Sequence, residues 1–294
     1  MLAIDADVVA TGLQDEGATL FVNAWNERMG VIAAKSVTLA QARKTRGGCI
    51  MHVLVVDVGG THVKILANGQ NAARQFPSGP TLTAEQMVAG VKKLTEDWKY
   101  DAVAIGYPGP VIHNRPLTDP WNLGRGWKGY DFAAAFKCPV KVVNDAVMQA
   151  LGSYEGGKML FLGLGTGLGS AMIVDGTVEP MELGHLPYKR RTFEDYVGSR
   201  GYERLGKKKW RQQIADVVAR LIAALEPEDV VVGGGNVKKL KELPPGCRAG
   251  DNTNAFLGGF RLWRETSGRT PSKLKSRKQA RAVDDQSGTK GAER

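Results

Sequence analysis

Two stretches of the chain share one pattern, which constrains the fold more than any other feature of the sequence. Each has an apolar run, a glycine-rich turn with a threonine, and a second apolar run; they cover residues 53–67 and 161–174. The first run of each stretch has few polar interruptions, as expected of a strand covered on both faces. Both stretches end at a turn signal, Asn68-Gly69 and Asp175-Gly176. The pattern predicts two hairpins in an α/β protein.

The glycines in these turns have two interpretations. They either make a tight turn and nothing more, or they allow consecutive backbone N–H groups to point at an anion, with the threonine hydroxyl beside them. Two such hairpins, about a hundred residues apart, favour the second interpretation, with two lobes that face one polyphosphate. Neither stretch is a Walker loop, because the chain contains no G-x-x-x-x-G-K-[ST] sequence.

Composition narrows the class of protein. The 294 residues are 43% hydrophobic, which is enough for one large domain or two modest ones. No run of about eighteen apolar residues is present, so we expect no membrane span, and the acidic start of the chain predicts a cytoplasmic protein without a leader. Three widely spaced cysteines argue against a disulfide framework.

The net charge of +10 favours an anionic ligand or partner. Polyanions of this kind include nucleic acid, an acidic membrane and phosphorylated small molecules. The sequence shows neither zinc-finger spacing nor an aromatic RNA-binding pattern, so nucleic acid is the weaker choice.

The two ends of the chain differ from its middle. Residues 1–50 carry no clear hydrophobic period, and Met51 stands directly before the first strand, which predicts an N-terminal extension that is disordered or upstream of the true start. A DNA-binding arm is the competing interpretation. Residues 265–294 are polar, basic and free of aromatics, which predicts a disordered tail.

A third predicted strand ends in polar residues. Residues 140–143 are mostly β-branched and lead into Asn144-Asp145, after which a helix is expected. Ligands of parallel α/β sheets bind beyond the carboxyl ends of strands, so these side chains belong at a ligand site. Asn-Asp before a helix is also an ordinary N-cap, and taken alone that interpretation is the stronger one.

Taken together and in order, these motifs resemble those of the ROK family of sugar kinases, in the actin-like superfamily. The resemblance extends over about residues 51–264 and is closest to the zinc-free branch of polyphosphate glucokinases. The motifs are Asp57 to Lys64, Asn122-Leu123, Asn144-Asp145, Gly165 to Gly169, Glu182 to His185, and Gly233 to Gly235.

The resemblance implies an α/β, actin-like (ribonuclease H-like) fold with two lobes and a cleft between them. The lobes would span residues 51–145 and 146–253, and a closing helix would follow at residues 254–264. The implied reaction is phosphoryl transfer from polyphosphate, ATP or both to the 6-hydroxyl of glucose, and a homodimer remains open.

The resemblance also implies roles for individual residues. Asp145 would be the catalytic base, and Asp57 would hold Mg²⁺ through water. The sugar would be bound by Asn122, Asn144, Glu182, His185 and Glu194. The donor phosphates would lie on Gly59, Gly60, Thr61, Lys64, Gly165, Thr166, Gly167, Gly233 and Gly234.

Some of these assignments have alternatives. Glu182 and His185 are also spaced as a surface pair on a helical turn. Most family members have a C-x-C-x-x-x-x-C zinc loop after the Gly-His pair, but this chain has no cysteine there, so we expect no zinc. Other functions to weigh are a ROK-type transcriptional repressor, which needs a DNA-binding arm, and a non-catalytic sugar-binding protein, for which Asp145 would be superfluous.

Overall fold

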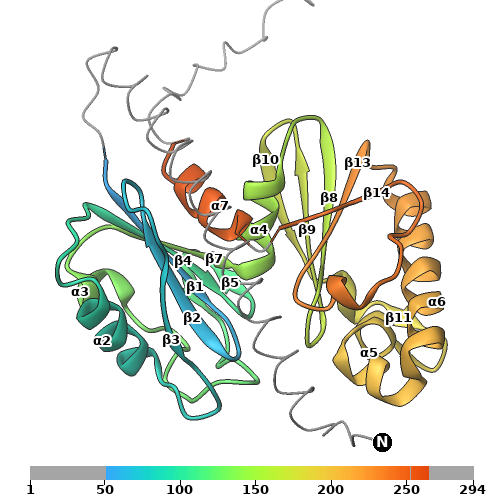
Figure 1. Cartoon of the computed structure of the whole chain (residues 1–294), viewed down its shortest axis with the longest axis horizontal. Coiled ribbons are helices and arrows are strands. Elements are labelled where there is room, and N and C mark those ends of the chain that lie inside the picture. The colour runs from blue at the N-terminus through green and yellow to red at the C-terminus, as the bar shows by residue number, and fades with distance from the viewer. Residues whose placement is uncertain (1–50, 252, 265–294) are drawn as a thin grey trace, which may run out of the picture.

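The computed structural model describes residues 51–251 and 253–264, and these form two five-stranded mixed sheets with helices between and outside them (Figure 1). The predictions for residues 1–50 and 265–294 lie outside the described residues. Within the described ranges, no helix is both long and apolar enough to cross a membrane.

The first sheet has the strand order β3-β2-β1-β4-β7. β1, β2 and β3 form an antiparallel meander, whereas β4 and β7 are parallel to β1. The strands are β1 (Val53–Val58), β2 (His62–Ala67), β3 (Arg74–Pro77), β4 (Ala102–Tyr107) and β7 (Val140–Asn144). A small hairpin, β5 (Val111–Ile112) with β6 (Arg115–Pro116), lies in the loop after β4.

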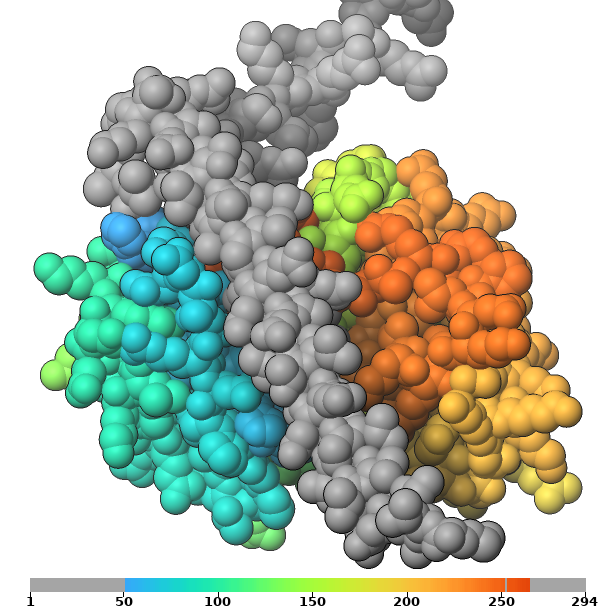
Figure 2. Space-filling model, viewed as in Figure 1, coloured from blue at the N-terminus to red at the C-terminus, as the bar shows by residue number. Residues whose placement is uncertain are grey.

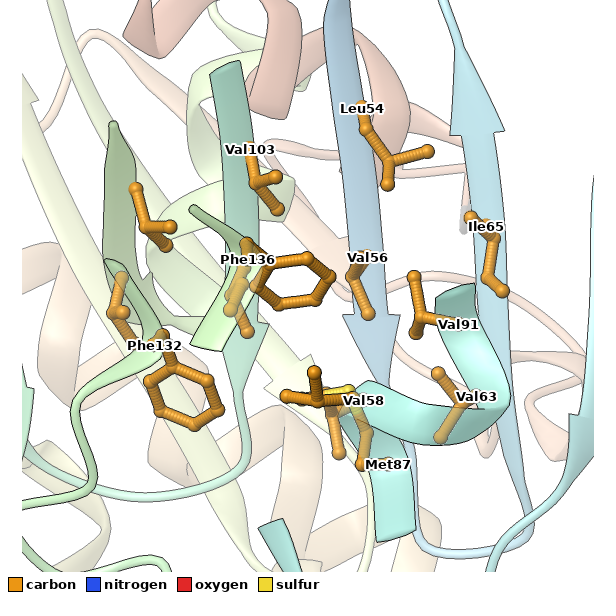
Figure 3. Close-up of a cluster of buried hydrophobic side chains, with 14 of the residues drawn as sticks. Leu54, Val56, Val58, Val63, Ile65, Met87, Val91, Val103, Phe132 and Phe136 are labelled. Carbon is orange, nitrogen blue, oxygen red and sulfur yellow. The ribbon is translucent and has the colours of Figure 1, made fainter. Parts of the chain in front are cut away.

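Helices α2 (Ala84–Leu94) and α3 (Phe132–Phe136) cover the outer face of this sheet (Figure 1). Residues 83–86 of the sequence predict a capped helix start, and α2 does begin at a capping box, in which Thr83 and Gln86 exchange side chain to backbone hydrogen bonds. Alternate residues of β1 face this layer, and Figure 3 shows Leu54, Val56 and Val58 packed with side chains of both helices.

The second sheet repeats this topology, with the order β10-β9-β8-β13-β14. β8, β9 and β10 are antiparallel, and β13 and β14 are parallel to β8. The strands are β8 (Lys158–Leu164), β9 (Leu168–Val174), β10 (Thr177–Met181), β13 (Asp229–Gly233) and β14 (Cys247–Ala249).

The segment from β10 to β13 covers the outer face of the second sheet (Figure 1). The sequence predicts a helix around residues 193–205 and a long helix over residues 209–225, and Gly206, with a φ of 72°, does interrupt α6 between them. A further break at Gly198 separates α5 from α6 and is not evident from the sequence. The elements are the 3-10 turn η1 (Leu183–His185), β11 (Pro187–Tyr188), β12 (Arg191–Thr192), α5 (Phe193–Val197), α6 (Ser199–Leu225) and, after β13, η2 (Val237–Lys239).

Two further helices join the sheets. α4 (Asp145–Ser153) follows the last strand of the first sheet, and α7 (Asn254–Leu262) follows the last strand of the second. α7 packs on β1 and β4 through Phe256 and Phe260, whereas α4 packs on β8 and β9. Figure 1 shows the pair between the sheets, and Figure 2 shows in the same view the residues of the first sheet (blue to green) and of the second (yellow to orange) on opposite sides.

Candidate active site

The candidate site begins with two carboxylates at the carboxyl ends of parallel strands. Asp57 lies near the end of β1, and Asp145 directly follows β7. Both residues are partly exposed but closely surrounded by protein. Burial and then the charge of Asp57 raise the pKa of Asp145 to about 7, although a hydrogen bond from the Ala146 N–H opposes the shift.

Burial also raises the pKa of Asp57, and the positive charge of Lys64 opposes this shift. Lys64 stands opposite Asp57 in the β1–β2 register, so the predicted phosphate-binding lysine accompanies the predicted metal-binding acid. Asp57 is therefore coupled electrostatically to Lys64 on one hand and to Asp145 on the other.

Asn144 has a structural role in the fold. Its Oδ1 accepts a hydrogen bond of 2.8 Å from the Ala146 N–H, and its Nδ2 donates one of 3.0 Å to the Gly109 carbonyl oxygen. The N-cap interpretation is thus confirmed for Asn144. Sugar binding by this residue remains a prediction.

A group of acids and a histidine continues from Asp145 into the second half of the chain. The charge of Glu182 acts on Asp145, and Glu182 in turn is affected by His185 and Glu194. Burial is the largest cause of the raised pKa of Glu182; the charge of His185 lowers it and that of Glu194 raises it. Glu182 is therefore within electrostatic range of Asp145, His185 and Glu194. Glu182 and His185 themselves are exposed on the η1 turn, so their spacing also fits the alternative of a surface pair.

Asn122 joins the site from the first half of the chain. A Cβ built on Gly60 would lie 2.2 Å from Asn122 Nδ2, so the predicted sugar-binding amide rests directly on the first phosphate turn. Any side chain at position 60 would displace it. The glycine is needed here for close approach, rather than for an unusual φ.

The second glycine turn is fixed to the start of α6. The Ser199 N–H donates to the Gly165 and Thr166 carbonyls, both at 3.1 Å, and Asn236 Nδ2 donates to the Gly165 carbonyl at 2.8 Å. On its other side, a Cβ built on Gly167 would lie 2.4 Å from Glu194 Oε2. The glycine turn that is predicted to bind the donor phosphates is therefore in contact with Glu194, which is predicted to bind the sugar.

Gly233 and Gly234 have a packing role that does not depend on a ligand. A Cβ at Gly233 would lie 2.7 Å from the Phe161 ring, and one at Gly234 would lie 2.5 Å from the Leu164 carbonyl oxygen. Gly234 also has a φ of 88°, which favours glycine. Their predicted place in donor binding stays a prediction.

The second half of the chain also has an open basic cavity. The lysine run that contributes to it is visible in the sequence, but the cavity itself is not. It has a volume of about 430 Å³ and is lined by Lys207, Lys208, Arg211, Lys241 and Glu242. Arg211 donates hydrogen bonds of 3.0 and 2.6 Å to the Lys239 carbonyl at the end of η2. η2 directly follows Asn236, which donates to the Gly165 carbonyl, so one short segment connects the second glycine turn with the residue that Arg211 contacts.

A structural zinc does not fit the residues after His185. Residues 186–193 include no cysteine, and no group of three or more His, Cys, Asp or Glu able to hold a metal ion occurs in ranges 51–251 and 253–264. A short hairpin, β11–β12, occupies this position instead.

Comparison with known proteins decides the family. Residues 53–201 match the model of the ROK family. The chain belongs to this family. A ROK relative, the polyphosphate glucokinase of Mycobacterium tuberculosis (strain CDC 1551 / Oshkosh), is 27% identical over 219 residues, which cover 66% of this chain and 81% of the relative.

Two other similarities agree with the ROK assignment. The bifunctional enzyme NanE/NanK of Brucella melitensis biotype 1 is 25% identical over 238 residues, 62% of this chain, and the match spans 45% of that enzyme's length. The crystal structure of the inorganic polyphosphate/ATP-glucomannokinase of Arthrobacter sp. strain KM has a TM-score of 0.62 at 23% identity, covering 72% of this chain and 98% of that one. This structure shows the same actin-like α/β fold, as the sequence predicts. The relatives support a sugar kinase role, but they fix neither the sugar nor the donor.

Proposed function

We propose that this ROK protein is a sugar kinase that transfers a phosphoryl group to the 6-hydroxyl of glucose, with Asp145 as the base. The observation that carries the proposal is the position of Asp145. It follows β7, it is within electrostatic reach of both Asp57 and Glu182, and its pKa is raised to about 7. A base with a pKa near the working pH is well suited to accept a hydroxyl proton.

In this mechanism the sugar lies between Asp145 and the amide and acid side chains around it. Asn122, Glu182, His185 and Glu194 offer donors and acceptors to adjacent hydroxyl groups. Glu182 and His185 are exposed and Asn122 and Glu194 are half-buried, so a sugar bound here would cover these polar groups, and a sugar that lacks a hydroxyl would leave one of them unpaired. The sugar oxygen attacks the terminal phosphorus of the donor, the bridging P–O bond breaks, and the hydroxyl proton passes to Asp145.

Mg²⁺ fits Asp57 if donor phosphates and water complete its coordination. The ion commonly uses one or two carboxylates together with substrate phosphates, and Asp57 lies close to Asp145 and beside the first glycine turn. When bound there, Mg²⁺ would neutralise charge on the donor phosphates. Asp57 would hold it through water, while Lys64 supplies a second positive charge from the opposite strand.

For the donor, we propose polyphosphate, with ATP as an additional donor. The basic cavity supports this choice, because three lysines and an arginine line it and only Glu242 opposes them. A linear polyanion gains from charges well beyond the reacting phosphate, whereas ATP ends in a neutral base and ribose. The name of the Mycobacterium tuberculosis relative agrees with this donor.

The proposal is tested by Asp145→Asn in a coupled assay with a panel of sugars and with ATP and polyphosphate supplied separately. The amide keeps the shape of the side chain but cannot accept the proton, so kcat should fall by roughly 10²–10⁴, while sugar affinity stays within a few-fold. A variant that retains more than about a tenth of the wild-type kcat would show that Asp145 is not the base. Wild-type protein that binds sugar but transfers no phosphate from either donor would favour a non-catalytic sugar-binding protein.

A further inference from the structure

A short hairpin connects two groups of predicted sugar-binding residues. Glu182 and His185 precede β11, and Glu194 lies in the first turn of α5 after β12. Backbone bonds make the connection tight: the Leu186 N–H donates to the Leu183 carbonyl at 3.1 Å, and the Phe193 N–H donates to the Leu186 carbonyl at 3.0 Å. The turn before the hairpin is also held by β9, because the Ser170 hydroxyl accepts from the Leu183 N–H at 3.1 Å and donates to the Met181 carbonyl at 2.8 Å. The hairpin connects this anchored turn to α5 and so contributes to the spacing between the turn and Glu194.

Each strand of this hairpin has only two residues, Pro187–Tyr188 and Arg191–Thr192. Hairpins of this size are not stable by themselves in water. The pairing within the hairpin is therefore too weak to hold its position, and a contact with the rest of the fold must do so.

Tyr188 provides that contact. The residue is only 5% exposed, and its ring packs at 5.3 Å from the ring of Phe193 and edge-on at 5.1 Å from that of Tyr196. Its hydroxyl lies within hydrogen-bond distance of the Asp216 carboxylate and 3.1 Å from Gln213 Oε1, both on α6. Because a hydroxyl has one proton, the carboxylate is the stronger acceptor for it.

Cations reinforce this attachment. Lys189 Nζ is hydrogen-bonded to Gln213 and lies 4.8 Å from the centre of the Tyr188 ring. Arg220 Nε donates to Asp216 at 3.1 Å, and its guanidinium carbon lies 5.6 Å from the same ring. Charge-assisted hydrogen bonds are stronger than neutral ones, so this cluster can fix the hairpin on α6.

We propose that Tyr188 is a positioning residue for the sugar site: its bond to Asp216 holds the hairpin on α6 and thereby sets Glu182 and His185 at the working distance from Glu194. This inference rests on the proposed sugar kinase function. Tyr188 itself does not touch the substrate in this scheme. Small displacements of binding groups are costly, since about 1 Å can change a rate by roughly 10²-fold.

The first test compares Tyr188→Phe with Tyr154→Phe. Tyr154 is a matched control because its hydroxyl also makes two hydrogen bonds in the second half of the chain, to the Gly157 carbonyl and from the Gly176 N–H, away from the hairpin. Loss of a hydrogen bond to a charged group changes an equilibrium constant by about tenfold or more. Tyr188→Phe should therefore raise the sugar KM by about tenfold and leave the donor KM within about twofold, whereas Tyr154→Phe should change neither.

Conservative variants of Asp216 separate positioning from general damage. Asp216→Asn keeps an oxygen acceptor and should retain most of the sugar affinity, whereas Asp216→Ala should lose at least as much as Tyr188→Phe, because it also removes the bond from Arg220. The double variant Tyr188→Phe/Asp216→Ala should be no worse than Asp216→Ala alone, because the Tyr188 bond is already absent there. Additive losses, or equal rises in the sugar and donor KM values, would overturn the proposal.

Hydrogen exchange on the full chain without substrate tests the hairpin independently of activity. Tyr188→Phe should accelerate exchange at the amides of His185, Leu186 and Phe193 relative to wild type, and Tyr154→Phe should not. Unchanged exchange at these amides would overturn the positioning role even if the kinase is confirmed. Faster exchange in a protein that phosphorylates no sugar would show that the hairpin is attached as argued and that the proposed function is the part that fails.

Discussion

At the scale of single residues, the proximity of Asp57 and Asp145 makes activity depend on pH. The raised pKa of Asp145 implies that kcat/KM falls as the pH drops through about 7, because the protonated carboxyl cannot act as a base. Asp57→Asn removes a repulsive charge and also the proposed Mg²⁺ contact, so kcat/KM should fall at every pH while the acidic limb of the normalised profile moves to lower pH, but only in part, since burial is the larger cause. A profile of kcat/KM from pH 5 to 9 checks this, and an unmoved limb would contradict the coupling of the two acids.

The same carboxylate should cost stability at neutral pH. The pKa of Asp145 is raised by folding, so the unfolded chain loses this proton near the ordinary value of 3.8, whereas the folded chain keeps it to about 7. Stability therefore declines as the pH rises between these values. Asp145→Asn should melt above wild type at pH 7.5 and close to it at pH 4, as measured by thermal unfolding. A variant that melts below wild type at both pH values would contradict the electrostatic strain.

Residue identity could be predicted here, but environment could not. The sequence places Asp145 at the end of a strand and Asn144 before a helix, and both observations hold in the structure. The raised pKa of Asp145 depends on β1 and β7 lying in one sheet with β4 between them, together with the approach of Glu182. The closeness of segments that are far apart in the sequence cannot be recognised from any local sequence pattern.

At the scale of elements, the contact between α4 and α7 depends on small residues. A Cβ built on Gly258 would lie 1.7 Å from the Met148 carbonyl oxygen, and one on Gly152 would lie 1.8 Å from the Asn254 carbonyl oxygen. Both neighbours are backbone atoms, which cannot rotate away as a side chain can. The two helices are therefore in direct backbone contact at these glycines.

Gly258→Ala should consequently destabilise the protein. Alanine is favoured over glycine in a helix by about 1 kcal/mol, but overpacking typically costs about 1–3 kcal/mol, and the rigid backbone contact places this site at the upper end. Denaturant unfolding should show a net loss of about 2 kcal/mol. Gly235→Ala is the control, because nothing lies within 4 Å of its Cβ position. A stability gain in Gly258→Ala would show that the helices do not pack this closely.

Most elements follow from local signals, but their contacts do not. The capping box of α2, the turn at Gly176 and the strand before Asn144 are all predicted from the sequence and present in the structure. The tyrosine of the β11–β12 hairpin stands out in no sequence pattern, because its partners on α6 lie more than twenty residues further along the chain. Packing of this kind is decided by the fold as a whole.

At the scale of the whole molecule, the two sheets repeat one topology, and each contributes a hairpin with a glycine turn. A helix that follows the last strand of each sheet lies between the sheets, where α4 carries Asp145 at its start. The predicted acceptor and donor groups therefore come from both halves of the chain. If the donor is polyphosphate, we expect the rest of its chain to lie on the outside of the second half, along the basic cavity.

The last prediction concerns that donor. Lys207, Lys208 and Lys209 lie exposed on α6, and the first two line the basic cavity. Replacing all three by glutamine should raise the KM for long polyphosphate by about tenfold, since each exposed charge contributes a few tenths to 1 kcal/mol, and should leave the KM values for ATP and glucose nearly constant. Added salt should weaken polyphosphate binding in the wild type, because charges are screened over about 8 Å at physiological ionic strength, and should have less effect in the variant.

A control variant with the same change in net charge at another place tests whether polyphosphate is attracted by the lysines of α6 or by the overall charge of the protein. Lys92, Lys93 and Lys99 are exposed on or just after α2, which covers the first sheet, and their triple glutamine variant carries the same net charge as the α6 variant. Equal effects of the two variants would mean that overall charge attracts the polyanion, with no preferred path. If polyphosphate is inert with every sugar while ATP works, the donor assignment fails. Phosphoryl transfer from ATP to the sugar, with Asp145 as the base, would still stand, because that role depends on the carboxylates and not on the basic cavity.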